Sequence, residues 1–139
     1  MPNTAPERQR VEVAAAVILD SAGRCLVSYR SAAQHQGDRW EFPGGKLEAG
    51  ESADQALARE LFEELDIVID GAVLLRRDCH DYPDKSVAVS FFEVTQWRGE
   101  PAGKQGQPIN WVAIESLDAE RFPAANRALI AQLQQRAQL

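Results

Sequence analysis

Hydrophobic residues recur along the chain with two different periods. Residues 11–19 and 86–97 are nearly continuous apolar runs rich in valine, alanine and phenylalanine, a composition typical of buried strands. Residues 52–65 instead place apolar side chains three and four positions apart, as an amphipathic helix does. The same helical spacing recurs in residues 124–138 and predicts a second helix there.

Shorter runs of strand-like composition lie between these segments. Residues 24–30 follow a turn at residues 20–23, so we expect them to form a hairpin with residues 11–19. Further strands are predicted at residues 40–42, 67–69, 73–79 and 109–114, separated by turns or loops at 31–39, 80–84 and 98–108. This order of elements alone predicts an α+β fold; two helices that flank a mixed β-sheet would make it an α/β/α sandwich.

The predicted helix at residues 52–65 concentrates acidic side chains on one face. Ser52 and Gln55 have the spacing of a capping box, which starts the helix. The carboxylates at positions i, i+3 and i+4 of this face are those of Glu60, Glu63 and Glu64. On the opposite side the pattern predicts a core-facing stripe made of Ala58, Leu61, Phe62 and Leu65.

This acidic face is a candidate metal site. Carboxylates at such spacing repel one another by about 0.2–0.5 kcal/mol per pair, and a hard divalent cation would convert the repulsion into binding because it prefers oxygen ligands. Gly44 and Gly45 just upstream form a tight loop where bare backbone can approach a ligand. Arg59 can pair with Glu63 one helical turn away. Taken alone, the glutamates would instead indicate a solvated acidic face, which most charge clusters are.

Composition narrows the function classes. The 139 residues suit one domain, which we place at residues 11–139 after a flexible tail at 1–10. A net charge of −6 argues against binding of nucleic-acid polymers and requires cations for contact with a polyphosphate.

Cys25 and Cys79 lack metal-ligand spacing and predict buried free thiols. Since no run has signal-peptide or membrane-spanning length, we expect a cytoplasmic monomer without membrane contact.

The arrangement of these residues resembles the Nudix box of the Nudix hydrolases. The matching positions are Gly45, Glu51, Arg59, Glu60, Leu61, Glu63, Glu64 and Ile67. Asp66 stands where the family has glycine; we expect a left-handed helix end there, which aspartate tolerates at modest cost. The resemblance implies the Nudix fold and hydrolysis of a nucleotide with Mg²⁺, for which Mn²⁺ can substitute.

Segments outside the box resemble the MutT branch of this family. They are residues 40–45, 99–101, 106–108 and 122–126. The branch implies hydrolysis of 8-oxo-dGTP to 8-oxo-dGMP and pyrophosphate, which cleans the nucleotide pool and prevents mutation. The alternatives are a Nudix hydrolase of another nucleotide (CTP, dGTP or a nucleoside-diphosphate sugar), a catalytically weak nucleotide-binding protein, and an acidic interaction module without a nucleotide.

The resemblance also implies roles for individual residues. The substrate contacts that it implies are Arg30, His35, Glu41, Phe42, Pro43, Gly44 and Asn126. Phe42 would lie beside the base, and the Asn126 amide, with its donor and acceptor, would address the altered edge of the oxidised purine. The metal ligands would be the Gly44 carbonyl, Glu60, Glu63 and Glu64. Glu60 or Glu63 would accept the proton of the attacking water, and Arg59 would orient the carboxylates.

Several of these residues also have simpler explanations. Asn126 is equally suited to cap the last helix, and a lone loop histidine such as His35 is commonly just exposed. Arg30 could be a strand-end charge and Phe42 a core residue. At the next turn, Tyr82 could lie at the pocket rim. Lys85, just after the turn, could reach a phosphate, but we expect it to be solvated.

Gln105 departs from the MutT pattern, which commonly has glutamate at this position. A glutamine can bind a cation through its carbonyl but cannot act as a carboxylate base. Either a box glutamate is the base or turnover is slow.

Overall fold

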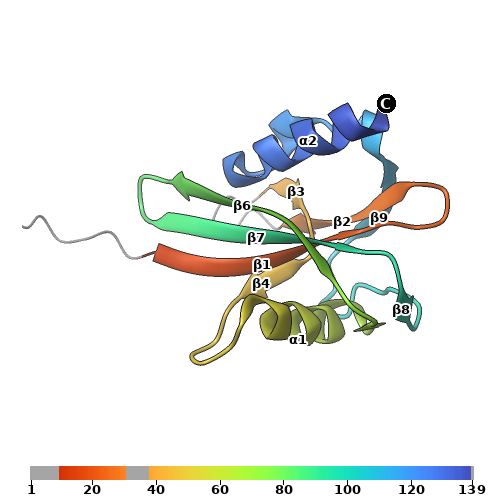
Figure 1. The fold of residues 1–139 in the computed structure, drawn as a ribbon, viewed down its shortest axis with the longest axis horizontal. Helices are drawn as coiled ribbons and strands as arrows, with labels where there is room; N and C mark the ends of the chain where they lie inside the picture. Colours follow the sequence, from red (N-terminus) through yellow and green to blue (C-terminus); the bar gives the residue numbers. More distant parts are fainter. Residues whose placement is uncertain (1–9, 31–37, 139) are drawn as a thin grey trace, which may run out of the picture.

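A central layer of strands separates two helices in the computed structural model, which describes residues 10–30 and 38–138 (Figure 1). Helices α1 (Ala53–Leu65) and α2 (Arg127–Ala137) cover opposite faces of this layer. The strands are β1 (Arg10–Ile18), β2 (Arg24–Arg30), β3 (Arg39–Glu41), β4 (Gly44–Lys46), β5 (Val68–Ile69), β6 (Val73–Asp81), β7 (Ser86–Val94), β8 (Trp97–Arg98) and β9 (Ile109–Ala113). The predicted α/β/α arrangement is therefore confirmed.

The strands form a mixed sheet and an antiparallel sheet, with β5 and β8 as a separate pair. The mixed sheet has the order β4-β1-β7-β6, in which β1 runs parallel to β7. The second sheet has the order β3-β2-β9. The hairpin expected between β1 and β2 is wrong: a single bridge, Leu19 to Cys25, joins them. β7 pairs along the whole of one edge of β1 and β4 pairs with residues 13–15 on the other edge, while β2 pairs with β3 and β9.

Alternate residues of β1 face two separate cores. Ala15 and Val17 belong to the core that also contains α2 residues, whereas Ala14, Ala16 and Ile18 belong to the core that contains α1 residues. Burial on both faces explains why this strand reads as a continuous apolar run. The central strand thus fixes the distance between the two helical layers.

Helix α1 starts and ends as predicted but buries a different stripe. The Ser52–Gln55 capping box is present, and Asp66 ends the helix in the left-handed conformation with φ 62°. The buried residues are Ala56, Leu57, Leu61 and Leu65. The placement of Ala58 and Phe62 in the core is wrong, because both lie to one side of this four-residue repeat. Phe62 is 51% exposed, and the Lys104 ammonium lies 5.3 Å from its ring centroid.

Some other boundaries differ from the expectations. Arg10 already belongs to β1, while residues 1–9 of the expected tail lie outside the described residues. β6 continues through Asp81 into the predicted turn at 80–84. The run at 86–97 breaks after Val94, since β8 pairs with β5 rather than extending β7. A 3-10 helix, η3 (Ala124–Asn126), precedes α2.

The two cysteines differ in burial. Cys25 is buried as expected, but Cys79 is exposed because it lies on β6, the edge strand of the mixed sheet. Burial raises the pKa of the Cys25 thiol to about 11, so it stays protonated. Among the helices of the described residues, none is long and apolar enough to span a membrane.

Candidate functional site

Arg59 is the centre of an ion-pair network on α1. Its Nε and Nη2 donate to both oxygens of Glu51 at 2.8 and 2.9 Å, and its Nη1 donates to Glu60 at 2.9 Å and to Glu63 at 3.3 Å. The bidentate bond to Arg59, with the N–H of Glu48, lowers the pKa of Glu51 to about 2. The expected Arg59–Glu63 pair is therefore present, and Arg59 also ties the preceding loop to the helix.

Glu64 has a different environment from the other box carboxylates. The backbone N–H of Gly44 donates to its Oε2 at 3.2 Å. Burial, followed by the negative charges of Glu60 and Glu41, raises the pKa of Glu64 to about 8, against the opposing effect of the Gly44 N–H. A partly buried carboxylate among like charges is a site that a cation would stabilise.

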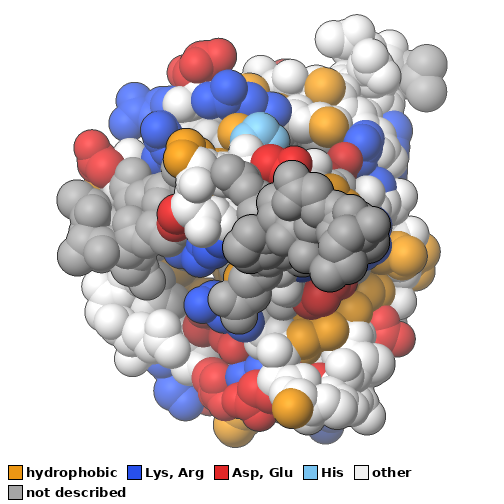
Figure 2. Space-filling view, turned by 90° about the vertical axis from the view of Figure 1, so that its left-hand side faces the viewer, with side chains coloured by type: hydrophobic (Ala, Val, Ile, Leu, Met, Phe, Trp, Pro, Cys, Tyr) orange, Lys and Arg blue, Asp and Glu red, His pale blue; other side chains and the backbone are white. Residues whose placement is uncertain are grey.

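Two glycines allow β4 to lie close to this helix. A Cβ at Gly44 would lie 2.0 Å from the Ala14 carbonyl oxygen of β1. At Gly45 a Cβ would lie 2.4 Å from the carboxyl carbon of Glu60. Only residues without a side chain fit both positions, which places bare backbone beside the acidic face of α1. Acidic and basic side chains gather in the lower part of the face in Figure 2, at the level of α1 in Figure 1.

The box carboxylates fit a hard divalent cation in chemistry but are not assembled around one point. In the described part of the chain, no group of three His, Cys, Asp or Glu side chains has metal-binding geometry. The reason lies in their hydrogen bonds, because Arg59 holds Glu60 and Glu63 while Gly44 holds Glu64. The donors are oxygens alone, as Mg²⁺ and Mn²⁺ prefer. Rotation of the Glu60 and Glu63 carboxylates away from Arg59 would free them to bind.

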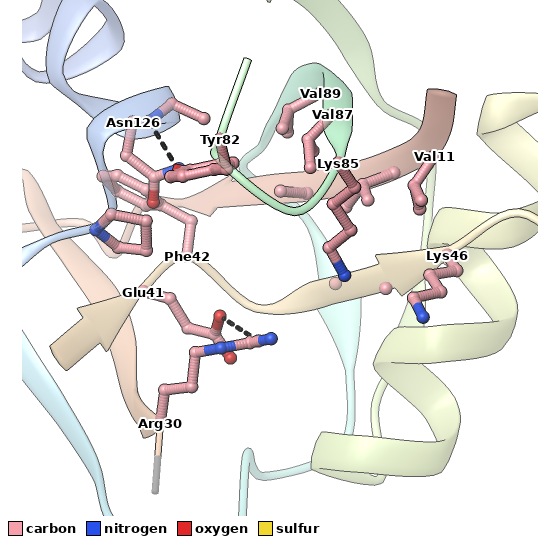
Figure 3. Close-up of a pocket in the computed structure, with 16 residues that line it drawn as sticks. Val11, Arg30, Glu41, Phe42, Lys46, Tyr82, Lys85, Val87, Val89 and Asn126 are labelled. Atoms are coloured by element: carbon pink, nitrogen blue, oxygen red, sulfur yellow. Dashed lines mark hydrogen bonds and ion pairs between the residues drawn. The ribbon is translucent and has the colours of Figure 1, made fainter. Parts of the chain in front are cut away.

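A cavity of about 140 Å³ opens beside this acidic site (Figure 3). It collects most of the residues expected to contact substrate: Arg30, Glu41, Phe42, Gly44 and Asn126. Pro43 is not among its lining residues; it is buried, and its carbonyl accepts the N–H of Ala16 at 2.8 Å. His35 lies outside the described residues.

The apolar floor of the cavity comes from two parallel strands. Val11 and Val13 of β1 pair in register with Val87 and Val89 of β7, and all four line the cavity. The sequence pattern predicts strands at these valines but does not indicate the cavity. Their alternation marks one face of each strand, but only the register shows that the two faces coincide.

The Arg30–Glu41 ion pair lies at the polar side of the cavity. Arg30 Nη1 donates to Glu41 Oε2 at 2.9 Å, and burial raises the pKa of Glu41 despite this arginine. Glu41 also lines a second cavity of about 390 Å³, together with Glu64 and Gln105. Gln105 therefore faces the same cavity as two carboxylates.

Positive charge gathers at the same side. Arg39 lies directly opposite Arg30 in the β2–β3 pair, and its buried Nε has no hydrogen-bond acceptor in the structure as described. The charges of Arg30 and Arg39 both oppose the rise in pKa that burial causes at Tyr82. An anionic or carbonyl oxygen at this edge would satisfy the unpaired donor.

Asn126 does not cap α2, although it occupies the N-cap position. The structure records no side-chain capping bond there, so the simpler explanation of this residue is wrong. Asn126 is 7% exposed and lines the cavity. Phe42 lies nearby and stacks on Phe122, with ring centroids 5.4 Å apart; it is therefore both a core residue and a wall of the cavity.

The turn between β6 and β7 contributes more than expected. Tyr82 is 5% exposed and lines the cavity, which agrees with its predicted place near the pocket. The expectation that Lys85 is solvated is wrong, because it is half-buried and also lines the cavity. Lys46 is a further lining residue that the sequence did not indicate. Figure 3 shows the Lys85 and Lys46 side chains along the same part of the cavity.

Comparisons with known proteins agree with this geometry. A family model described as NUDIX domain matches residues 14–132. The 8-oxo-dGTP diphosphatase of Haemophilus influenzae is 42% identical over 127 residues, which cover 91% of this chain and 93% of the relative. The enzyme of the same name from Escherichia coli K12 is 37% identical over 125 residues, covering 90% and 97%.

A solved structure supports the same assignment. It comes from a study of MutT from Aliivibrio salmonicida and Vibrio cholerae, and it superimposes with a TM-score of 0.77 at 35% identity. The superposition covers 92% of this chain and 99% of the other. Fold, site geometry and sequence similarity therefore agree that this chain belongs to the Nudix family.

Proposed function

We propose that this protein hydrolyses 8-oxo-dGTP to 8-oxo-dGMP and pyrophosphate, with Mg²⁺ as cofactor and Mn²⁺ as a substitute. One observation carries this proposal. The side-chain amide of Asn126 makes no capping bond to α2 and instead lines an apolar cavity beside the acidic site of α1. The names of the relatives from Haemophilus influenzae and Escherichia coli support the same substrate. The reaction would remove oxidised guanine from the nucleotide pool before it is incorporated into DNA.

The cavity would hold the purine. Phe42 and the valines of β1 and β7 supply apolar surface for its faces. The Asn126 amide offers a donor and an acceptor, so it can pair with the edge that oxidation alters. Arg30, Lys46 and Lys85 line the same cavity and would attract the triphosphate.

The carboxylates of α1 would hold the metal. Glu60, Glu63 and Glu64, with the carbonyl of Gly44, are the ligands that we propose. A bound divalent cation neutralises phosphate charge and lowers the pKa of the attacking water. Glu60 or Glu63 would accept the proton of that water. Arg59, which already bonds to both, would orient them.

Gln105 would contribute an amide rather than a base. It lines the second cavity with Glu41 and Glu64, and its side chain cannot accept a proton at neutral pH. If this position limits the rate, Gln105→Glu should raise kcat with little change in KM.

We further propose that the protein acts on free nucleotides as a cytoplasmic monomer, without a nucleic-acid polymer or membrane as partner.

A substrate panel tests the proposed function. Pyrophosphate release is measured with Mg²⁺ from 8-oxo-dGTP, dGTP, CTP and ADP-ribose at low substrate concentration, with a chelator as control. The proposal predicts that 8-oxo-dGTP has the highest kcat/KM and that the chelator stops the reaction. A higher kcat/KM for CTP or ADP-ribose would reject the proposed substrate and keep the Nudix chemistry.

A further inference from the structure

Tyr82 connects two segments that line the cavity from different parts of the chain. Its backbone N–H donates to the Lys85 carbonyl at 2.8 Å and so closes the turn between β6 and β7. Its side-chain oxygen accepts the backbone N–H of Ala125 at 3.0 Å, within the buried interior. Figure 3 shows the Tyr82 ring extending from the turn toward the segment that carries Asn126.

The Ala125 N–H needs an acceptor from outside its own helix. It lies at the start of η3, where the first N–H groups have no partner within the helix. Pro123 occupies the N-cap position of η3 and makes no side-chain capping bond. The Tyr82 hydroxyl therefore supplies the acceptor that a capping side chain would normally provide.

Asn126 follows Ala125 directly and joins η3 to the start of α2. Its backbone N–H donates to the Pro123 carbonyl at 2.9 Å, but its side chain makes no capping bond to α2. The position of its amide in the cavity therefore depends on how the backbone of η3 is held. The Tyr82–Ala125 hydrogen bond holds that backbone one residue away.

We propose that the Tyr82 hydroxyl is a positioning element for base discrimination. It fixes the Asn126 amide relative to the β6–β7 turn, and so sets the preference for an oxidised over an unmodified guanine nucleotide. This inference rests on the proposed function. The physical reason is that a polar group discriminates between two bases only if it is held within about 0.5 Å of its productive position.

The test is Tyr82→Phe, which keeps the ring and removes the acceptor. The quantity to measure is the ratio of kcat/KM for 8-oxo-dGTP to that for dGTP. We expect this ratio to fall by about 2- to 10-fold, the range that the loss of one neutral hydrogen bond allows. An unchanged ratio would overturn the inference.

Ser86→Ala is the matched control. The Ser86 hydroxyl donates to Asp81 in the same β6–β7 hairpin, and Ser86 does not line the cavity. This variant also removes one hydroxyl hydrogen bond from the hairpin, so it reports any general loosening. We expect its ratio to match the wild type. A ratio that falls equally in Ser86→Ala and Tyr82→Phe would show loosening of the hairpin and contradict a specific role for Tyr82.

A double-mutant cycle with Asn126→Ala separates positioning from general stability. If Tyr82 acts through Asn126, Tyr82→Phe should leave the ratio unchanged once Asn126 is alanine. If Tyr82→Phe lowers the ratio by the same factor whether residue 126 is asparagine or alanine, the inference is overturned. A wild-type protein without preference would reject the proposed function and this inference together, whereas a wild-type preference that survives in Tyr82→Phe would reject only the role of Tyr82.

Discussion

The backbone N–H of Gly44 donates to Glu64 Oε2 at 3.2 Å, across a separation of 20 residues. This bond joins the first residue of β4 to the C-terminal end of α1. It joins a backbone segment that lines the apolar cavity to a carboxylate with a raised pKa that lines the second cavity. The candidate metal site and the candidate base pocket therefore share the Gly44 segment as a common wall.

Glu64→Gln should abolish metal-dependent hydrolysis and leave the protein folded. The amide can still accept the Gly44 N–H through its oxygen but no longer carries the charge that binds a cation. We expect kcat/KM to fall by roughly 100-fold or more, because even outer-sphere partners of metal sites typically contribute 10–100-fold. Pyrophosphate release and a thermal melt check the two parts. Full activity in this variant would remove Glu64 from the metal site.

The raised pKa of Glu64 predicts how stability depends on pH in the metal-free protein. The group titrates near 4.5 when unfolded and near 8 when folded, so between these values the folded state binds more protons. Stability should therefore fall as pH rises through this window, by up to about 1.4 kcal/mol per pH unit. Thermal melts with a chelator should show the wild type losing stability relative to Glu64→Gln from pH 4.5 to 8. A constant difference would contradict the buried, protonated carboxyl.

Gly45→Ala should lower kcat/KM but leave the free energy of unfolding nearly unchanged. The new Cβ would lie 2.4 Å from the Glu60 carboxyl carbon, and the flexible glutamate would move aside rather than unfold the helix. Gly71→Ala is the control, because its Cβ meets open space at φ +98° and should cost about 1–2 kcal/mol of stability with activity kept. Kinetics and urea unfolding of both variants measure the contrast, and normal activity in Gly45→Ala would show that Glu60 need not stay where it is.

Asn126→Ala should change selectivity and leave α2 nearly as stable. The amide makes no capping bond, so the loss of stability should stay below the ~1 kcal/mol typical of a lost cap. The preference for 8-oxo-dGTP over dGTP should fall by roughly 10-fold, as expected from the loss of about two neutral hydrogen bonds. Parallel kinetics on both nucleotides give the ratio. If stability falls and the ratio does not, Asn126 is a structural residue.

Leu61→Ala and Phe62→Ala should differ sharply despite their adjacency. Leu61 is fully buried in the core beneath α1, so its truncation should cost about 2–5 kcal/mol. Phe62 is 51% exposed, and its loss, including the contact with Lys104, should cost no more than about 1 kcal/mol. Urea unfolding curves give both values, and equal costs would show that α1 packs by the other face.

Local patterns predicted the elements well, and tertiary contacts explain the failures. The Ser52 cap and the left-handed Asp66 end depend on neighbours within one turn of α1, so the sequence contains the information. The prediction that Phe62 faces the core is wrong because the apolar residues 57, 61 and 65 have the same helical spacing. Only packing against the sheet determines which of the two stripes is buried. The β1–β2 hairpin failed because β7 approaches β1 from far along the chain.

The sequence predicts the part of the site that lies on one helix, but not the part that distant strands build together. The box glutamates and Arg59 lie on one helix, and their mutual spacing could be inferred from it alone. The cavity could not be inferred in full, because Val11 and Val87 meet only through strand register. The sequence does not show that Lys85 lines the cavity, because the pattern of its turn is that of an ordinary surface turn and the Tyr82–Ala125 bond, which links that turn to η3, joins distant parts of the chain.

The most direct test of the account is a competition assay with one substrate mixture. Equal, low concentrations of 8-oxo-dGTP and dGTP are incubated with the protein and Mg²⁺, and both monophosphate products are quantified at early times. We predict that 8-oxo-dGMP is the dominant product and that its excess over dGMP falls by roughly 10-fold in Asn126→Ala. Equal amounts of 8-oxo-dGMP and dGMP from the wild-type protein would contradict the assignment of the cavity as a pocket for oxidised guanine.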